Sequence, residues 1–84
     1  MRAAQMVEPG HFVVVDAPDP RPGHDEVLVR TRTASICGSD LHTVFEGTYA
    51  GPFPAPVGHP GHEGVGTVVE ARSERVAVGD AVLT

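Results

Sequence analysis

Side chains that suit a metal ion lie in the middle of this 84-residue sequence. Cys37 supplies a thiol, and the stretch GHEGVG supplies His62 with Glu63 directly after it. A thiolate and an imidazole are a good partial ligand set for Zn²⁺, and Glu63 suits either a third ligand or a group that tunes the metal. The 25 residues from Cys37 to His62 are enough for the chain to fold back. Spacing alone leaves two interpretations open: a zinc site, or a buried cysteine and an unrelated loop histidine.

Two other kinds of metal site do not fit these residues. A zinc-protease helix needs the pattern HExxH, but Gly64, Val65 and Gly66 follow His62 and Glu63. A closed structural zinc site needs four Cys or His ligands, usually in paired short spacings, and the sequence has one cysteine. A zinc site here would therefore be open, with a coordination position for water or substrate, as catalytic sites are.

The other histidines are weaker candidates. His11 and His24 stand beside turn residues, which predicts solvated surface positions. His59 precedes Pro60 in a loop and is expected to form hydrogen bonds in a turn. His42 therefore remains as a candidate for chemistry beside Cys37 and His62.

Alternating apolar and polar residues predict strands before these candidates. Residues 2–7 and 11–18 are expected to pair as a hairpin. Residues 25–36 are the clearest strand, because valine and threonine alternate there with leucine and arginine. Cys37 comes just past the end of this strand.

A short helix and a long loop are predicted between the two halves of the candidate site. Ser39 is expected to cap a helical turn over residues 40–45, which Gly47 ends. Residues 46–61 contain four prolines, which remove backbone donors and fix φ. This loop is therefore expected to be ordered but irregular.

Two more strands are predicted after His62. Glycines in residues 64–71 would let another backbone approach closely, and residues 75–84 form the last predicted strand. A strand that stops at Thr84 leaves an open sheet edge. We therefore expect the chain to be the front part of a longer polypeptide, with one domain at most in these 84 residues.

Charge and composition argue against several classes of partner. Six arginines, no lysine and eleven carboxylates give a formal net charge of −5, which does not suit a nucleic acid backbone. No apolar run is long enough for a signal peptide or a membrane span. A single cysteine excludes an internal disulfide and is compatible with a reducing cytosol. The sequence predicts a soluble cytoplasmic protein with no nucleic acid or membrane partner.

Three motifs together resemble one known family. The segments ICGSDLH at 36–42, GHEGVG at 61–66 and VGDAV at 78–82 resemble the zinc-dependent medium-chain alcohol dehydrogenases in order and spacing. The resemblance implies a mainly β fold, a GroES-like partly closed β-barrel that is incomplete because the chain stops at Thr84. Residues 1–84 would be the N-terminal part of that catalytic domain, without the family's Rossmann cofactor domain.

The resemblance also implies a ligand set. Zn²⁺ would be held by Cys37 and His62, with a third ligand from sequence beyond Thr84. Glu63 matches a residue that lies next to the metal and coordinates it in some members. These three residues are the predicted metal site.

Further roles follow from the same resemblance. Ser39 matches the hydroxyl residue that hydrogen-bonds the substrate alcohol in the family. His42 matches the residue at the end of the proton relay toward solvent. Asp40 is expected to have a capping or structural role. Gly38 stands where classical members often carry a basic residue, so the chain looks closer to the polyol, threonine and secondary-alcohol branches.

The implied reaction is oxidation of an alcohol or polyol to an aldehyde or ketone. Zinc makes the alkoxide accessible, and the hydride passes to NAD or NADP. The full-length protein would be a homo-oligomer. No GxGxxG motif is present, so the cofactor would be bound by a domain outside these residues, and this segment alone would be inactive.

Two alternatives stay open. One is a zinc-free quinone or enoyl reductase of the same superfamily, although such members generally lack the cysteine and GHE ligands. The other is a free-standing GroES-like interaction module or an inactive remnant, for which chain length is the only support.

Overall fold

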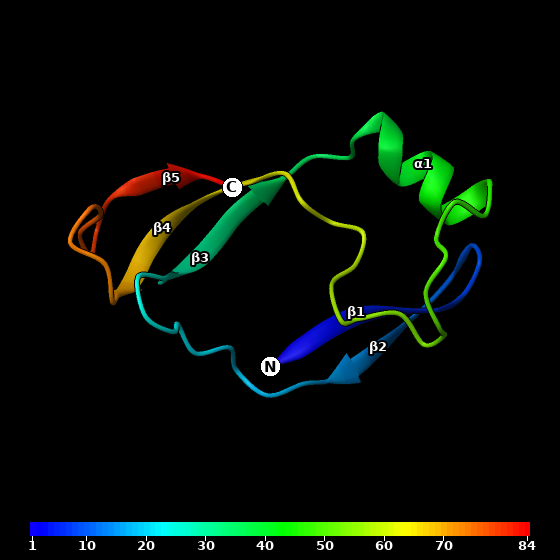
Figure 1. Ribbon diagram of the computed structural model, residues 1–84, viewed down its shortest axis with the longest axis horizontal. Coiled ribbons are helices and arrows are strands. Elements are labelled where there is room, and N and C mark those ends of the chain that lie inside the picture. Colours follow the sequence, from blue (N-terminus) through cyan, green and yellow to red (C-terminus); the bar gives the residue numbers. More distant parts are fainter. The chain divides into compact units, whose positions relative to one another are not determined.

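The computed structural model describes all residues, 1–84, and is mainly β (Figure 1). The chain forms two compact units, each built from two separate segments. The hairpin unit comprises residues 1–19 and 36–62, and the three-stranded unit comprises residues 20–35 and 63–84. No helix is long and apolar enough to cross a membrane.

The hairpin unit begins with the predicted pair of strands. Strand β1 (Arg2–Glu8) pairs antiparallel with β2 (His11–Asp16), which ends two residues earlier than predicted. Gly10 has φ +73° and allows the chain to reverse between them. The side chain of Met6 in β1 is fully buried.

The proline-rich loop is ordered because it bonds to β1. The N–H of Ala55 donates to the carbonyl of Met6, and that of Gly58 to Ala4, both at 2.9 Å. The side-chain amide of Gln5 donates back to the carbonyl of Ala55 at 2.9 Å. Residues 46–61 contain no helix or strand, so the prediction of an ordered, irregular loop is confirmed.

Helix α1 (Gly38–Phe45) starts earlier than predicted. Cys37, not Ser39, is the N-cap residue, so the predicted cap is wrong. The reason is Asp40, whose Oδ2 accepts a hydrogen bond from the N–H of Cys37 at 2.9 Å and so fixes the first turn two residues upstream. The helix ends at Phe45 with Glu46 as its C-cap. Gly47 follows with φ +69°, so the prediction that this glycine ends the helix is confirmed.

The three-stranded unit is an antiparallel sheet with β4 in the centre. Strand β3 (Val27–Ala34) pairs with β4 (Gly64–Ala71), which pairs with β5 (Ala81–Leu83). A Cβ added at Gly66 would lie within 3.0 Å of the Arg30 carbonyl oxygen. The predicted close backbone approach at a glycine of β4 is therefore confirmed.

The last predicted strand is mostly a turn. Strand β5 covers only Ala81–Leu83 instead of residues 75–84. Gly79 has φ +96°, and the carboxylate of Asp80 accepts a hydrogen bond from the N–H of Ala77 at 2.9 Å. These residues close a turn that alternating hydrophobicity does not reveal.

The close approach at Gly66 predicts the cost of a substitution there. We expect Gly66→Ala to lower the free energy of unfolding by at least about 2 kcal/mol, because the new methyl group meets the backbone of β3. Gly38→Ala is the matched control, since nothing lies within 4 Å of the added Cβ there, and its effect should stay below about 1 kcal/mol. Urea denaturation followed by circular dichroism measures both. Equal stabilities for the two variants would contradict the proposed packing.

Candidate metal centre

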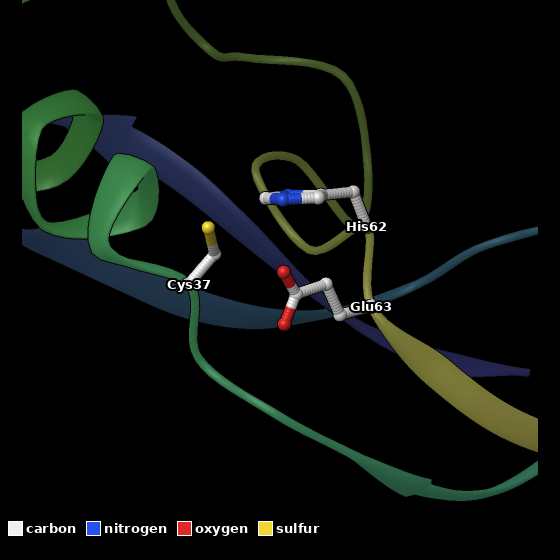
Figure 2. Close-up of side chains that lie close together, drawn as sticks. All are labelled: Cys37, His62 and Glu63. Atoms are coloured by element: carbon white, nitrogen blue, oxygen red, sulfur yellow. The ribbon is translucent and has the colours of Figure 1, made fainter.

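The structure brings Cys37, His62 and Glu63 together (Figure 2). One ligand atom from each, a sulfur, a ring nitrogen and a carboxylate oxygen, lies within 4.8 Å of the others. The three are the only group of ligand-type residues in the chain arranged in this way. The set predicted as metal ligands is therefore close in space, while its occupation by zinc stays a prediction.

Each member of the set is held by a different local feature. Cys37 is the N-cap of α1, where the backbone N–H groups of the first turn favour negative charge on the sulfur. His62 ends the proline-rich loop. Glu63 comes directly before β4, and its carbonyl accepts a hydrogen bond from the N–H of Ser35 at 3.1 Å.

The donor set and its spacing fit zinc. Zinc bonds are about 2.0 to 2.3 Å long, so two ligand atoms of one tetrahedral ion are about 3.3 to 3.8 Å apart. The atoms of this set lie within 4.8 Å of one another, so the side chains would have to close by up to about 1.5 Å on a bound ion. Thiolate, imidazole and carboxylate are all ordinary zinc ligands.

Hydrogen bonding fixes the tautomer of His62. Its Nδ1 lies 2.9 Å from the carbonyl oxygen of Pro60. Because a carbonyl oxygen only accepts hydrogen bonds, Nδ1 carries the proton and the neutral ring has its lone pair on Nε2. Nε2 is therefore the ring atom suited to a metal.

Asp40 supports the same ring orientation. Its Oδ1 is buried and forms no well-aligned hydrogen bond, yet it lies 3.2 Å from Nδ1 of His62. The expected capping role of Asp40 is confirmed through its other oxygen. The proximity to His62 was not predicted, although a carboxylate three residues after Cys37 is a capping-box signal that also places it beside the ligands.

The surroundings of His62 raise its pKa above the ordinary value. The main cause is the hydrogen bond to the Pro60 carbonyl, followed by a hydrogen bond with the Cys37 side chain. The charges of Asp40 and Cys37 act in the same direction, and desolvation opposes them. Protons therefore compete for this ring at higher pH than for an ordinary histidine.

The two predicted catalytic residues lie on α1. Ser39 is exposed in the first turn, and its carbonyl accepts a hydrogen bond from the Thr43 hydroxyl at 3.0 Å. His42 follows three residues later, on the same side of the helix, and its side chain is 60% exposed. Their roles toward an alcohol stay predictions.

Two partners of candidate residues were missed. Glu46 hydrogen bonds Nδ1 of His42 through its carboxylate, an i,i+4 pair that helical spacing could have indicated. Ser35 donates from its hydroxyl to Oε2 of Glu63 at 2.7 Å. That contact depends on the strand register, which the sequence does not specify.

The remaining histidines lie outside the ligand set. His11 and His24 are exposed, as predicted. The ring of His59 packs against Tyr49 with ring centres 4.9 Å apart, and its buried Nε2 forms no hydrogen bond. The prediction that His59 is no ligand agrees with the observed set. Its backbone N–H makes the expected turn hydrogen bond, to the Pro56 carbonyl at 3.1 Å, while its ring is a packing group.

Comparison with known proteins gives one family and several relatives. The alcohol dehydrogenase GroES-like domain matches residues 23–84. Over 86 residues, the chain is 49% identical to a probable zinc-binding alcohol dehydrogenase of Mycobacterium tuberculosis, covering 99% of this chain and 21% of that protein. It is 45% identical over 69 residues to L-threonine 3-dehydrogenase of Coxiella burnetii, covering 79% of this chain and 20% of that protein. It is 39% identical over 85 residues to D-arabinitol dehydrogenase 1 of Uromyces fabae, covering 99% of this chain and 23% of that protein. The chain thus spans about a fifth of the length of these curated relatives.

The raised pKa of His62 predicts how zinc binding depends on pH. The imidazole binds zinc only when Nε2 is deprotonated, so zinc affinity should fall as pH drops through the raised pKa of His62. Competition with a chromophoric chelator from about pH 8 to about pH 5.5 measures the dissociation constant across that transition. Asp40→Asn should move the transition to lower pH, because it removes a negative charge beside the ring. An affinity independent of pH over this range would contradict the assignment.

Proposed function

Because the chain belongs to the alcohol dehydrogenase GroES-like domain family, we propose that it supplies the zinc site of a dehydrogenase acting on an alcohol or polyol with NAD or NADP. The observation that carries the proposal is the cluster of Cys37, His62 and Glu63. The names of the relatives support it, since all three are dehydrogenases and one is called zinc-binding. The fold prediction agrees with the family, which is GroES-like, and with the mainly β structure.

Cys37, His62 and Glu63 would hold the metal, with further coordination from outside these residues. Zinc bound there would act as a Lewis acid and make a hydroxyl group of the substrate more acidic. The cluster supports this proposal over a zinc-free reductase, for which such a ligand set would have no use.

The residues of the site are held in place before a ligand arrives. Pro60 and Asp40 orient the ring of His62, and the start of α1 orients Cys37. Hydrogen bonds that fix a ligand histidine typically matter for affinity, because less freedom is lost on binding. Zinc is therefore expected to bind without rearrangement of the main chain.

The proton released by the substrate would leave along α1. Ser39 and His42 lie one turn apart, so a hydroxyl near the substrate is followed by an imidazole near solvent. Glu46 accepts the Nδ1 proton of His42, which leaves Nε2 as the atom that takes up the proton from Ser39. The exposed ring can then release it to water.

The hydride acceptor would be bound elsewhere in the full-length protein. Residues 1–84 contain no GxGxxG motif, and the two units use all 84 residues without forming a dinucleotide-binding fold. We therefore propose that these residues supply the metal and proton chemistry, with NAD or NADP held by a separate domain.

The metal assignment can be tested in the full-length protein. Cys37→Ser and His62→Ala should each weaken zinc binding more than roughly 100-fold, because a direct ligand is lost, and should abolish alcohol-dependent NAD(P)H formation. His24→Ala is the matched control, since it removes an exposed histidine outside the cluster. Elemental analysis of zinc after dialysis and a dehydrogenase assay give the two readouts. Unchanged zinc content in both ligand variants would refute the site.

The proton path gives a separate test. His42→Asn should lower kcat about 10-fold with zinc content unchanged, and added imidazole should restore part of the rate. Ser39→Ala should lower kcat about 100-fold or more, because it removes the group next to the substrate. His11→Ala is the matched control, since His11 is likewise exposed and paired with a carboxylate, that of Glu8. If His42→Asn leaves kcat unchanged, His42 is not part of the proton path.

A further inference from the structure

Ser35 and Glu63 are joined by two hydrogen bonds at the end of the three-stranded sheet. The backbone N–H of Ser35 donates to the Glu63 carbonyl at 3.1 Å, and the Ser35 hydroxyl donates to Oε2 of Glu63 at 2.7 Å. Ser35 directly follows β3, and Glu63 directly precedes β4. The first bond continues the strand pairing, and the second fixes the carboxylate.

The backbone at this point has little freedom to slide. Gly64, the first residue of β4, is buried, and its carbonyl accepts a hydrogen bond from the N–H of Thr84 at 2.8 Å. A Cβ added at Gly64 would lie 3.2 Å from Thr84 Oγ1 and 3.4 Å from Thr31 Cγ2. Neighbours on both sides therefore hold β4 in register, and Ser35 stays opposite Glu63.

The Glu63 side chain also borders open space. Ser35 and Glu63 both line an open cavity of about 510 Å³ in the three-stranded unit. Packing on that side therefore does not restrict the carboxylate. A hydrogen bond from a fixed donor is a direct way to restrain a side chain that borders open space.

We propose that Ser35 is a positioning residue, whose hydroxyl holds the Glu63 carboxylate in the orientation that meets the metal. This inference rests on the proposed zinc function. A carboxylate has about four lone-pair sites, so a hydroxyl on Oε2 and a metal ion can be served at once. Partners that orient a metal ligand typically change metal affinity by 10- to 100-fold when they are removed.

A purely structural role for Ser35 makes a different prediction. If Ser35 were only structural, Ser35→Ala would lower the stability of the protein and leave metal affinity unchanged. The positioning role predicts the reverse: the unfolding transition stays nearly unchanged, because exposed hydrogen bonds of this kind add little to stability, and metal affinity falls. The two roles are thus separated by measuring metal affinity and stability on the same variants.

The experiment uses the full-length protein, freed of metal and titrated with Co²⁺, whose visible d–d bands report the coordination geometry, and then with Zn²⁺. Ser35→Ala should weaken the binding of both ions by roughly 10- to 100-fold and alter the Co²⁺ bands. Ser35→Thr keeps the hydroxyl and should restore affinity and spectrum. Ser73→Ala removes a serine hydroxyl elsewhere in the three-stranded unit and should leave both unchanged.

A double-mutant cycle with Glu63→Gln shows whether Ser35 acts through Glu63. The effect of Ser35→Ala should vanish in the Glu63→Gln background. A full effect in that background, or wild-type affinity and spectrum in Ser35→Ala, would overturn the inference. Either result leaves the zinc proposal standing as long as Cys37→Ser loses the metal. If Cys37→Ser keeps full affinity, the zinc proposal itself fails.

Discussion

The pairing of β3 with β4 is the constraint on which the candidate site depends. The pairing runs to Ala34 and Gly64, and the Ser35–Glu63 backbone bond extends it by one step. Cys37 comes two residues after Ser35, as the N-cap of α1, and His62 comes one residue before Glu63. A thiol and an imidazole that are far apart in sequence thus leave the sheet at the same end. A shift of the register by one residue would turn Glu63 to the opposite face of β4.

The regular elements were largely predictable, and the errors have local causes. Alternation along β3 and the glycines of β4 indicated both strands, because a sheet with a solvated face imposes a period of two. The helix start was misplaced because Ser39 is a common capping type, whereas the observed cap depends on the Asp40 side chain reaching back to Cys37. Strand β5 was overextended because valines alternate through a turn that Gly79 and Asp80 form.

The residues of the candidate cluster were predictable, but their surroundings were not. A single cysteine and a GHE motif narrow the choice of ligands, since few side chains bind zinc well. The contacts of these residues, however, are made by Asp40, Pro60 and Ser35, which hold the His62 ring and the Glu63 carboxylate. Such contacts depend on register and rotamer, and neither is written in the hydrophobic pattern. His59 shows the reverse case, because a histidine beside the motif proved to be a packing group.

The orientation of Glu63 matters because it sets the charge at the site. A thiolate with a neutral imidazole carries one negative charge, which leaves a divalent cation with net positive charge and the power to acidify a hydroxyl. A carboxylate that joins the coordination adds a second negative charge and cancels the rest. In our proposal the Ser35 hydroxyl turns the Glu63 carboxylate toward the ion, so the strand pairing that places Ser35 opposite Glu63 would also set this charge.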